Sequence, residues 1–220
     1  MSFWKITELI IAHVLLSLLL FAAAIALFVF LIRKYVRKYK PSDVAIFDKF
    51  KPSVNSINNK IMLFITFLGK HQFLIPANLI LILYFSLIKK QNWFSIRVLA
   101  IALSSLVLMI ILKQLFQRKR PLSPLLKAAR GLSFPSGHAI MAVTFYGLLI
   151  YIIDQSNNAD WVRYLLIVLL AILIVWIAIS RVYLRVHYAS DVMAGLIIGM
   201  VWLFISLGVL SKLETLVRSQ

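Results

Sequence analysis

The sequence predicts an all-α integral membrane protein, a single membrane domain built as a bundle of six transmembrane helices. Of its 220 residues, 62% are hydrophobic and the mean hydropathy is +0.95, whereas soluble domains contain about 45–50% apolar residues. The apolar residues also gather in runs of about 17–24, and about 20 are needed for a helix to cross a hydrocarbon core roughly 30 Å thick. Composition and run length therefore both exclude a water-soluble globule.

Charge is scarce but strongly one-sided. The chain has 24 Lys and Arg against 7 Asp and Glu, a formal net charge of +17. Nucleic-acid-binding proteins carry such charge on a polar surface, whereas here it lies between apolar runs, so we expect an anionic partner at the bilayer and no nucleic acid. Because the chain has no cysteine, disulfides, thiol catalysis and thiolate metal sites are excluded.

The first predicted span covers about residues 9–32. It is too long for a signal peptide and lacks a small-residue cleavage site, so we expect it to be permanent. The other five cover about 73–88, 94–112, 139–153, 161–179 and 192–210. The even number places both termini on one side of the membrane. In the last span, Gly195 and Gly199 form a GxxxG pair that favours close helix packing.

A polar connector, residues 33–60, separates the first two spans. It opens with the basic-aromatic run RKYVRKYK and contains Asp43, Asp48 and Lys51. A basic, amphipathic segment beside a span commonly lies at the lipid headgroups and attracts anionic lipid. The alternative is a solvated connector whose positive charge faces the bilayer.

Three polar segments fall on the side opposite the termini. The first, KQLFQRKRP, places Lys113 six residues before the pair formed by Arg120 and Pro121. Cations at the end of a span can bind an anion or simply extend to the interface. The second, FPSGHA, brings Ser136, Gly137 and His138 to the start of a helix. Free backbone N–H groups, a hydroxyl and an imidazole suit an anion there, although a helix cap is the alternative.

The third segment, ISRVYLRVHYASD, contains a histidine and a carboxylate four residues apart. If it is helical, His187 and Asp191 share a face, so the carboxylate can hold one ring nitrogen and leave the other free as a nucleophile or base. Arg181 lies about two turns earlier and can direct its guanidinium to the same place. The alternative is a surface ion pair at a helix start.

Convergence of the three segments favours a phosphate pocket. Lys113, Arg120 and Arg181 would repel one another by about 4 kcal/mol per pair at 4 Å and an effective dielectric of 20. A phosphate would relieve this cost and accept bidentate hydrogen bonds. With two histidines present, one can attack phosphorus while the other protonates the departing oxygen.

Together these residues resemble the three-part signature of the type 2 phosphatidic acid phosphatase superfamily, which also includes the vanadium haloperoxidases. The signature reads K-x6-R-P, then P-S-G-H, then S-R-x5-H-x3-D, and every position matches. The resemblance covers about residues 64–210, the expected phosphatase core. It implies that His187 is the nucleophile and forms a phosphohistidine, that Asp191 supports it, and that His138 protonates the leaving lipid alkoxide.

The resemblance also implies how phosphate is bound. The expected phosphate-binding residues are Lys113, Arg120, Ser136, Gly137 and Arg181. Arg185 stands where many members carry glycine, so it either contacts a second phosphate or acidic headgroup or faces water. Neither a metal nor another cofactor is expected, and no obligate protein partner is evident.

The expected activity is metal-independent hydrolysis of a lipid phosphomonoester or diphosphate. The resemblance implies phosphatidic acid, phosphatidylglycerol phosphate, polyprenyl diphosphate or lipid A phosphate as the lipid substrate, and the sequence does not choose among them. One alternative is a lipid phosphotransferase that uses the same phosphohistidine. A second is a non-catalytic transporter or scaffold for anionic lipids.

The expected location is the cell (inner) membrane, which the chain crosses several times. The resemblance implies an extracytoplasmic catalytic face and cytoplasmic termini. Of the 24 Lys and Arg, however, only seven fall on the terminal side and 17 on the catalytic side, which the positive-inside rule would place in the cytoplasm. We follow the resemblance, because loops that serve an anionic substrate carry positive charge for a reason other than topology.

Overall fold

The computed structural model describes residues 30, 33–34, 41–125, 131–156 and 159–219. The chain divides into two compact units, residues 1–38 and 39–220, and the second contains nearly all described residues. Throughout the described ranges every regular element is a helix, as predicted. The first predicted span, about 9–32, lies almost entirely outside them.

Five helices of the second unit are long and apolar enough to cross a membrane. They are α4 (His71–Leu83) with its π-helical continuation η2 (Tyr84–Ile88), α5 (Asn92–Phe116), α6 (Gly137–Asp154), α7 (Asp160–Tyr183) and α8 (Ala189–Arg218). They correspond in order to the second to sixth predicted spans. The prediction of an integral membrane helical bundle is therefore confirmed, while the first of the six predicted spans, about 9–32, falls almost entirely on residues that the structure does not describe.

The helices extend beyond the apolar runs that predicted them. The last span was expected over 192–210, but α8 runs from Ala189 to Arg218. At about 1.5 Å per residue, its 30 residues measure about 45 Å, longer than the roughly 30 Å hydrocarbon core. Polar residues extend the helix at both ends, so Asp191 and Glu214 lie within it.

From residue 41 on, the connector predicted over 33–60 contains two helical segments and the start of a third. These are α2 (Pro41–Phe50), the 3-10 turn η1 (Lys51–Ser53) and α3 (Ser56–Leu68). Asn55 caps α3, since its side-chain oxygen accepts a hydrogen bond from the backbone N–H of Asn58 at 2.8 Å. With 13 residues, α3 is apolar but too short to cross a membrane. The headgroup-binding role of the connector stays a prediction.

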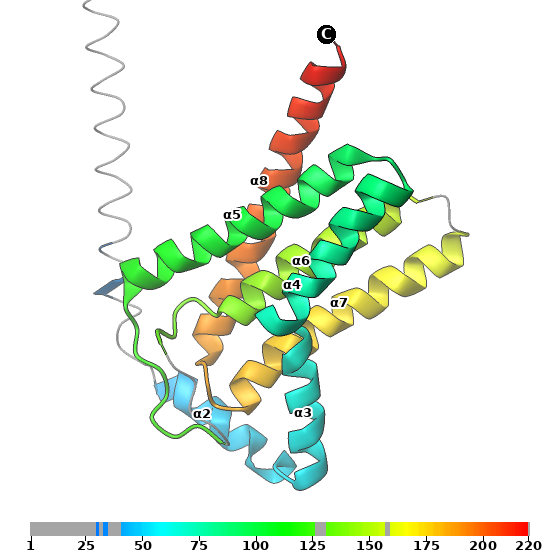
Figure 1. The fold of residues 1–220 in the computed structure, drawn as a ribbon. Helices are drawn as coiled ribbons and strands as arrows, with labels where there is room; N and C mark the ends of the chain where they lie inside the picture. Colours follow the sequence, from blue (N-terminus) through cyan, green and yellow to red (C-terminus); the bar gives the residue numbers. More distant parts are fainter. Residues whose placement is uncertain (1–29, 31–32, 35–40, 126–130, 157–158, 220) are drawn as a thin grey trace, which may run out of the picture. The chain divides into compact units, whose positions relative to one another are not determined.

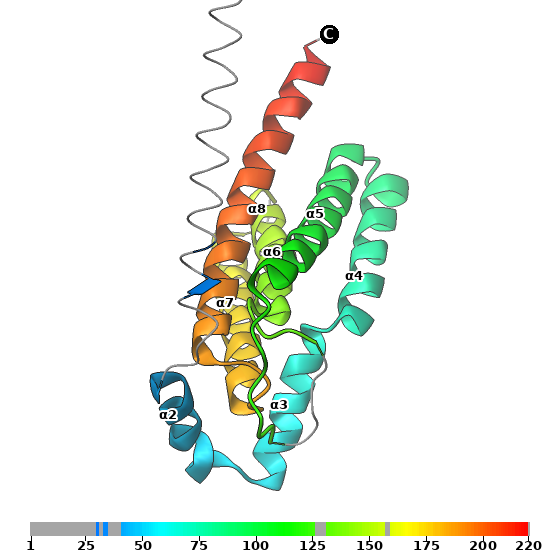
Figure 2. The same cartoon turned by 90° about the vertical axis from the view of Figure 1, so that its left-hand side faces the viewer.

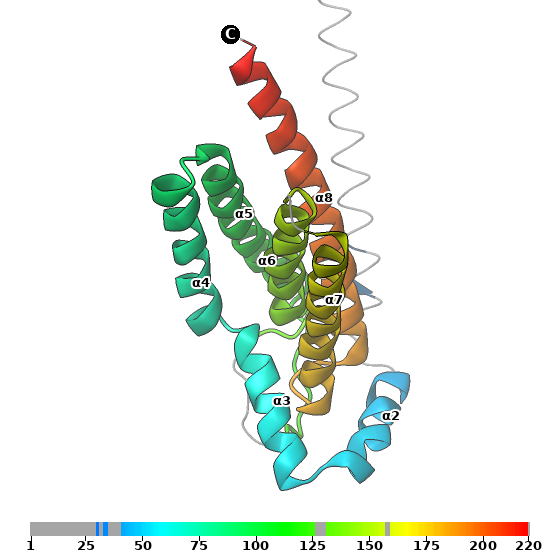
Figure 3. The same ribbon diagram turned by 90° about the vertical axis from the view of Figure 1, so that its right-hand side faces the viewer.

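Helix α6 lies at the centre of the bundle and packs against α5, α7 and α8 (Figures 1 and 3). The GxxxG pair of α8 faces it directly. A Cβ on Gly195 would lie 2.8 Å from the carbonyl oxygen of Ser136, and one on Gly199 would lie 3.0 Å from Cβ of Val143. The two glycines therefore allow α8 to approach α6, as predicted, at the point where α6 begins.

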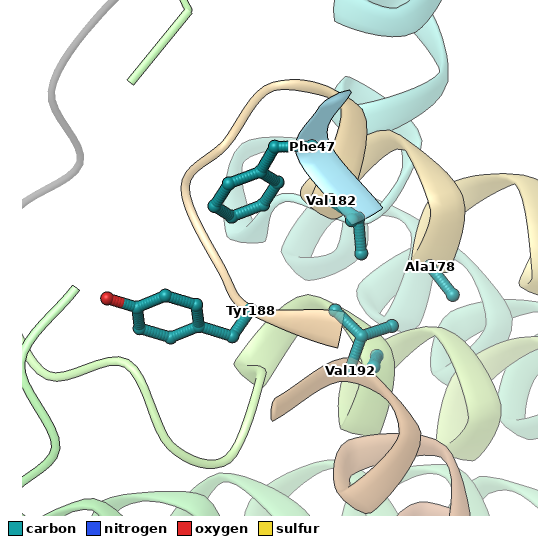
Figure 4. Close-up of a cluster of buried hydrophobic side chains, with 6 residues drawn as sticks. Phe47, Ala178, Val182, Tyr188 and Val192 are labelled. Atoms are coloured by element: carbon teal, nitrogen blue, oxygen red, sulfur yellow. The ribbon is translucent and has the colours of Figure 1, made fainter. Parts of the chain in front are cut away.

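Successive long helices alternate in direction, so the loops after α5 and α7 reach the same end of the bundle (Figure 2). The C-terminus lies at the opposite end. Helix α2 is also at the loop end and buries Phe47 in an apolar cluster (Figure 4). The other members of this cluster are Ala139, Ala178, Val182, Tyr188 and Val192. The three predicted motifs therefore meet at one end, against α2.

Candidate active site

His187 lies in the short turn between α7 and α8 and is only 1% exposed. Its Nε2 lies 3.1 Å from Nη1 of Arg120. A guanidinium only donates, so Nε2 accepts this hydrogen bond and the ring proton belongs on Nδ1. Burial lowers the pKa of His187 to about 3, against an opposing effect of Asp191. The ring is therefore neutral at pH 7.

The Nδ1 side of His187 faces a carboxylate and a hydroxyl. Oδ2 of Asp191 lies 3.7 Å from Nδ1, and the hydroxyl oxygen of Ser133 lies 3.4 Å from it. We expected His187 and Asp191 to share a helical face. This stretch is not one helix, because His187 precedes α8 and only Asp191 is helical. They meet because Asp191 folds back over the first turn, where Oδ2 accepts the backbone N–H of Tyr188 at 3.0 Å.

Asp191 is fully buried and engaged on both carboxylate oxygens. Its Oδ1 accepts a hydrogen bond from Nη1 of Arg118 at 2.6 Å, and its Oδ2 also accepts one from the hydroxyl of Ser133. Its backbone carbonyl accepts from the N–H of Ser136 at 3.0 Å. This last bond links the second and third motifs directly.

Three predicted phosphate ligands are held by neutral groups. Nζ of Lys113 donates to the carbonyl oxygens of Leu132 (2.8 Å) and Pro135 (3.0 Å). Arg120 donates to the carbonyl of Val186 at 2.8 Å, and Arg181, from the end of α7, donates to the hydroxyl of Thr66.

Within the described ranges, none of these three cations forms an ion pair. Burial lowers the pKa of Arg120, which Asp191 partly opposes. Carbonyl and hydroxyl oxygens thus orient three positive charges without neutralising them. Such a site favours an anion.

The second motif supplies polar atoms that find no partner among the described residues. The hydroxyl of Ser136 and Nε2 of His138 are both buried without a hydrogen bond. Buried polar atoms of this kind usually receive a ligand or water. Gly137 opens α6, and a Cβ there would lie 2.5 Å from the sulfur of Met109. This close contact favours glycine at position 137. The same position lies near Lys113, since the Cβ would be 3.8 Å from its Cε, so the free N–H groups at the start of α6 are close to that cation.

Arg185 lies outside the cluster around His187. The Cζ atom of its guanidinium is 5.9 Å from the ring centroid of Phe47, and its φ of 53° is in the left-handed region that favours glycine. It lines a separate cavity of about 320 Å³. The other lining residues are Lys119, Arg120, Pro121, Leu122, Pro124 and Val186.

Sequence reasoning missed four residues of this region. Ser133 and Arg118 contact Asp191, Asp43 contacts Arg118, and Thr66 contacts Arg181. Arg118 lies within the first motif and Ser133 directly precedes the second, so their positions in the sequence could have indicated them. Asp43 lies 75 residues before Arg118 and has no local pattern that predicts the contact. Within the described part of the chain, no group of three or more His, Asp or Glu could hold a metal ion.

Comparisons with known proteins agree with this geometry. Residues 93–214 match the PAP2 superfamily, more than half of the chain. The chain is 28% identical to phosphatidylglycerophosphatase B of Bacillus subtilis (strain 168) over 158 residues, which cover 71% of this chain and 77% of the relative.

Two solved structures share the fold. One is a transmembrane PAP2-type phosphatidylglycerolphosphate phosphatase from Bacillus subtilis, with a TM-score of 0.73, 25% identity and coverage of 86% of this chain and 96% of that chain. The other is LpxE of Aquifex aeolicus, with a TM-score of 0.61, 25% identity and coverage of 79% and 98%. The family match, the phosphatases among the relatives and the five membrane-crossing helices confirm the expected family and enzyme class. The chain therefore belongs to the PAP2 superfamily and is a membrane phosphatase of that family.

Proposed function

We propose that this protein hydrolyses lipid phosphates through a phosphohistidine formed on His187. One observation carries the proposal: the buried, neutral ring directs the lone pair of Nε2 toward Arg120 and its Nδ1 toward Asp191. A nucleophile needs an unprotonated nitrogen with a lone pair, and the opposite nitrogen needs a group that stabilises the positive charge of the intermediate. Both are present in a site with three unneutralised cations.

In the first step, the substrate phosphate binds to Lys113, Arg120 and Arg181. Arg120 transfers its hydrogen bond from Nε2 to a phosphate oxygen, which frees the lone pair. Nε2 then forms a bond to phosphorus as the bond from phosphorus to the lipid oxygen breaks. The bound anion favours the protonated form of His138, which gives its proton to the departing oxygen.

In the second step, the phosphohistidine is hydrolysed. His138, now neutral, takes a proton from water, and the resulting hydroxide attacks phosphorus. The bond between phosphorus and Nε2 breaks, which restores the neutral ring of His187 and releases inorganic phosphate. Hydrogen bonds from the hydroxyl of Ser136 and from the first N–H groups of α6 stabilise the charge on the transferred group.

The decisive experiment is phosphate release by detergent-solubilised protein, combined with acid-quench trapping of a phosphoenzyme from ³²P-labelled lipid. We expect His187→Ala to abolish both, whereas His138→Ala slows release more than it prevents labelling when the leaving group is good. His71→Ala is the matched control, because His71 is exposed at the start of α4. Retained turnover in His187→Ala would refute the nucleophile assignment.

Lipid substrates follow from the position of the site at the ends of membrane-crossing helices. An amphiphile can present its phosphate there while its chains stay in the bilayer. The candidates are phosphatidic acid, phosphatidylglycerol phosphate, polyprenyl diphosphate and lipid A phosphate. The Bacillus relatives are named for the phosphatidylglycerol phosphate reaction, so this lipid is our first candidate in a phosphate-release panel over the four classes.

The cavity beside Arg185 gives this choice a structural basis. Lys119 and Arg185 add two positive charges to its lining, and Arg120 belongs both to this cavity and to the contact with Nε2 of His187. A volume of about 320 Å³ is within the range of small-ligand sites, about 300–1,000 Å³. We propose that a second phosphate of the substrate binds here.

Arg185→Gly tests the second contact, because glycine accepts the positive φ and only the cation is lost. We expect kcat/KM for phosphatidylglycerol phosphate to fall about fivefold to tenfold, roughly the effect of one surface-accessible charge-assisted hydrogen bond. The value for phosphatidic acid, which has a single phosphate, should change less than about twofold. Equal losses with both lipids would contradict a second-phosphate role.

We further propose that the protein lies in the cell inner membrane with its catalytic face outside the cytoplasm. A chain without cysteine allows single cysteines to report sidedness. Ser53→Cys lies beyond α2 at the catalytic end, and Ser156→Cys follows α6 at the other end. In intact cells, a membrane-impermeant maleimide should label only the first. The reverse pattern would place catalysis in the cytoplasm.

A further inference from the structure

Arg118 is buried between two carboxylates from distant parts of the chain. It is 2% exposed. Its Nη2 donates to Oδ2 of Asp43 at 2.8 Å, and its Nη1 donates to Oδ1 of Asp191 at 2.6 Å. The first carboxylate belongs to α2, the second to the first turn of α8. One guanidinium thus joins the connector helix to the carboxylate that faces His187.

Asp43 also binds the start of α8 directly. Its Oδ1 accepts the backbone N–H of Ser190 at 3.1 Å, and its Oδ2 accepts the hydroxyl of Ser190 at 2.8 Å. The N–H groups of the first helical turn have no partner within the helix, so Asp43 acts as a cap supplied from another element. Asp43 itself is only 4% exposed, so this contact is made from a buried carboxylate.

Apolar packing makes this arrangement rigid. The ring of Phe47, one turn after Asp43, stacks on Tyr188 with centroids 6.0 Å apart and is buried with Val182 and Val192 (Figure 4). The guanidinium of Arg118 also lies over the ring of Tyr188, with Cζ 4.4 Å from the ring centroid. Helix α2 is therefore seated on the turn that carries His187.

The charges of this network matter for the proposed intermediate. Two carboxylates, Asp43 and Asp191, face one guanidinium, Arg118, so the group as a whole retains one negative charge. That charge lies next to Nδ1 of His187, where a positive charge develops when Nε2 attacks phosphorus. Without the charge of Asp43, the positive charge of Arg118 would be balanced by Asp191 alone. The carboxylate of Asp191 would then stabilise the positively charged ring of His187 less.

We infer that Asp43 and Arg118 are positioning residues for the reaction, and that α2 orients Asp191 against His187 and sets the charge behind it. This inference rests on the proposed phosphohistidine chemistry. It assigns to the connector a role in catalysis in addition to any contact with lipid headgroups.

Asp43→Asn is the principal test, because it preserves size and keeps one oxygen acceptor while it removes the charge. We expect kcat to fall about 10-fold to 100-fold, the usual effect of losing a partner behind a directly acting ligand, with KM within about twofold. Asp48→Asn is the matched control. Asp48 lies in the same helix, but its carboxylate is exposed, and among the described residues it forms an ion pair with the exposed side chain of Lys51 at 2.7 Å.

A double-mutant comparison separates positioning from folding. If Asp43 acts through Asp191, then Asp43→Asn should cause no further loss of kcat in an Asp191→Asn background. An equal fold-loss in both backgrounds would overturn the inference. So would an unchanged kcat per folded molecule in Asp43→Asn, whatever its Tm.

The proposed function fails under a different result. It fails if the wild-type protein releases no phosphate from any of the four lipid classes and forms no phosphoenzyme. A wild-type enzyme that turns over and an Asp43→Asn variant that is equally active would refute only the inference.

Discussion

Arg120 occupies the lone pair of the predicted nucleophile, since its Nη1 donates to Nε2 of His187 at 3.1 Å. The same guanidinium is anchored by the carbonyl oxygens of Val186 and Gly131 at 2.8 and 3.2 Å. The anchored group needs only a small shift to reach a phosphate oxygen beside Nε2. Substrate binding and release of the nucleophile are therefore one event in the proposed mechanism.

Arg120→Lys should expose this dual role. Lysine keeps the charge but is a compact point charge that cannot hold the carbonyl of Val186 and a phosphate oxygen in the same fork. We expect kcat/KM for phosphatidic acid to fall about 100-fold, similar to the loss of one preorganised donor at a developing charge. The measurement is initial-rate phosphate release. Lys60→Arg, at an exposed position of α3 outside the site, should remain within about twofold.

The pKa of His187 predicts a pH dependence of stability. In the folded protein burial lowers this pKa to about 3, whereas an unfolded histidine has a pKa of about 6.5. Between these values the unfolded chain binds one more proton than the folded protein. Stability should therefore fall as the pH drops from about 6.5 toward 3, by up to about 1.4 kcal/mol per pH unit.

The Tm of detergent-solubilised protein between pH 7.5 and 5 checks this prediction. The wild type should lose more of its Tm over the interval than His187→Gln, which cannot take up the proton. Parallel curves for the two proteins would show that His187 is not held neutral by burial.

Gly195→Ala should disturb the site through helix packing. The added Cβ would lie 2.8 Å from the carbonyl oxygen of Ser136 and 2.9 Å from Cβ of Ala139, and neither can move without shifting the start of α6. Overpacking of this kind typically costs about 1–3 kcal/mol. We expect a lower Tm and a lower kcat together.

Gly208→Ala is the control within the same helix. A Cβ at Gly208 meets no atom of the described residues within 4 Å, and alanine is the better helix former by about 1 kcal/mol. Its Tm should be equal to or higher than that of the wild type, with unchanged activity. A similar loss at both glycines would indicate a general effect on α8 rather than contact with α6.

Substitutions at the end of the bundle opposite the site are predicted to lower stability without changing activity. Arg97 of α5 pairs with Glu214 of α8 at 2.6 Å, and both side chains are largely buried. Glu214→Gln would leave the buried cation of Arg97 without its carboxylate partner, at a cost of about 3 kcal/mol. We expect a lower Tm with kcat per folded molecule unchanged, as measured by phosphate release after purification of the monodisperse fraction.

Arg218→Ala is the comparison variant for Glu214→Gln. Arg218 also contacts Glu214, at 2.6 Å, but its side chain is 68% exposed, so its loss should lower stability by less than about 1 kcal/mol. Equal destabilisation by the two variants would contradict a special role for the buried partner.

Sequence and structure agree best where the signal is local. Apolar run lengths located the five described spans, because a helix that crosses lipid must bury nearly every side chain in apolar surroundings. The spacing of Lys113, Arg120, His138 and His187 indicated a shared site, and the alternating direction of the helices brings these residues to one end.

Long-range contacts could not be obtained from the sequence in the same way. Asp43 belongs to a stretch with mixed charge, and nothing near it indicates that Arg118, far along the chain, will bury against it. The relation of His187 to Asp191 was anticipated from four-residue spacing, yet the geometry depends on a turn followed by a helix start. Such details follow from packing between elements, which a single sequence does not encode in a local period.

The way in which the three cations are held has a consequence for turnover. Lys113, Arg120 and Arg181 are oriented by carbonyl and hydroxyl oxygens, so their affinity for a small dianion persists after the lipid has left. Inorganic phosphate presents the same charged oxygens as the substrate and is smaller. If the three cations bind phosphate as proposed, we therefore expect the product to compete with the lipid for the site, so that the rate in the bilayer falls as the local concentration of free phosphate rises.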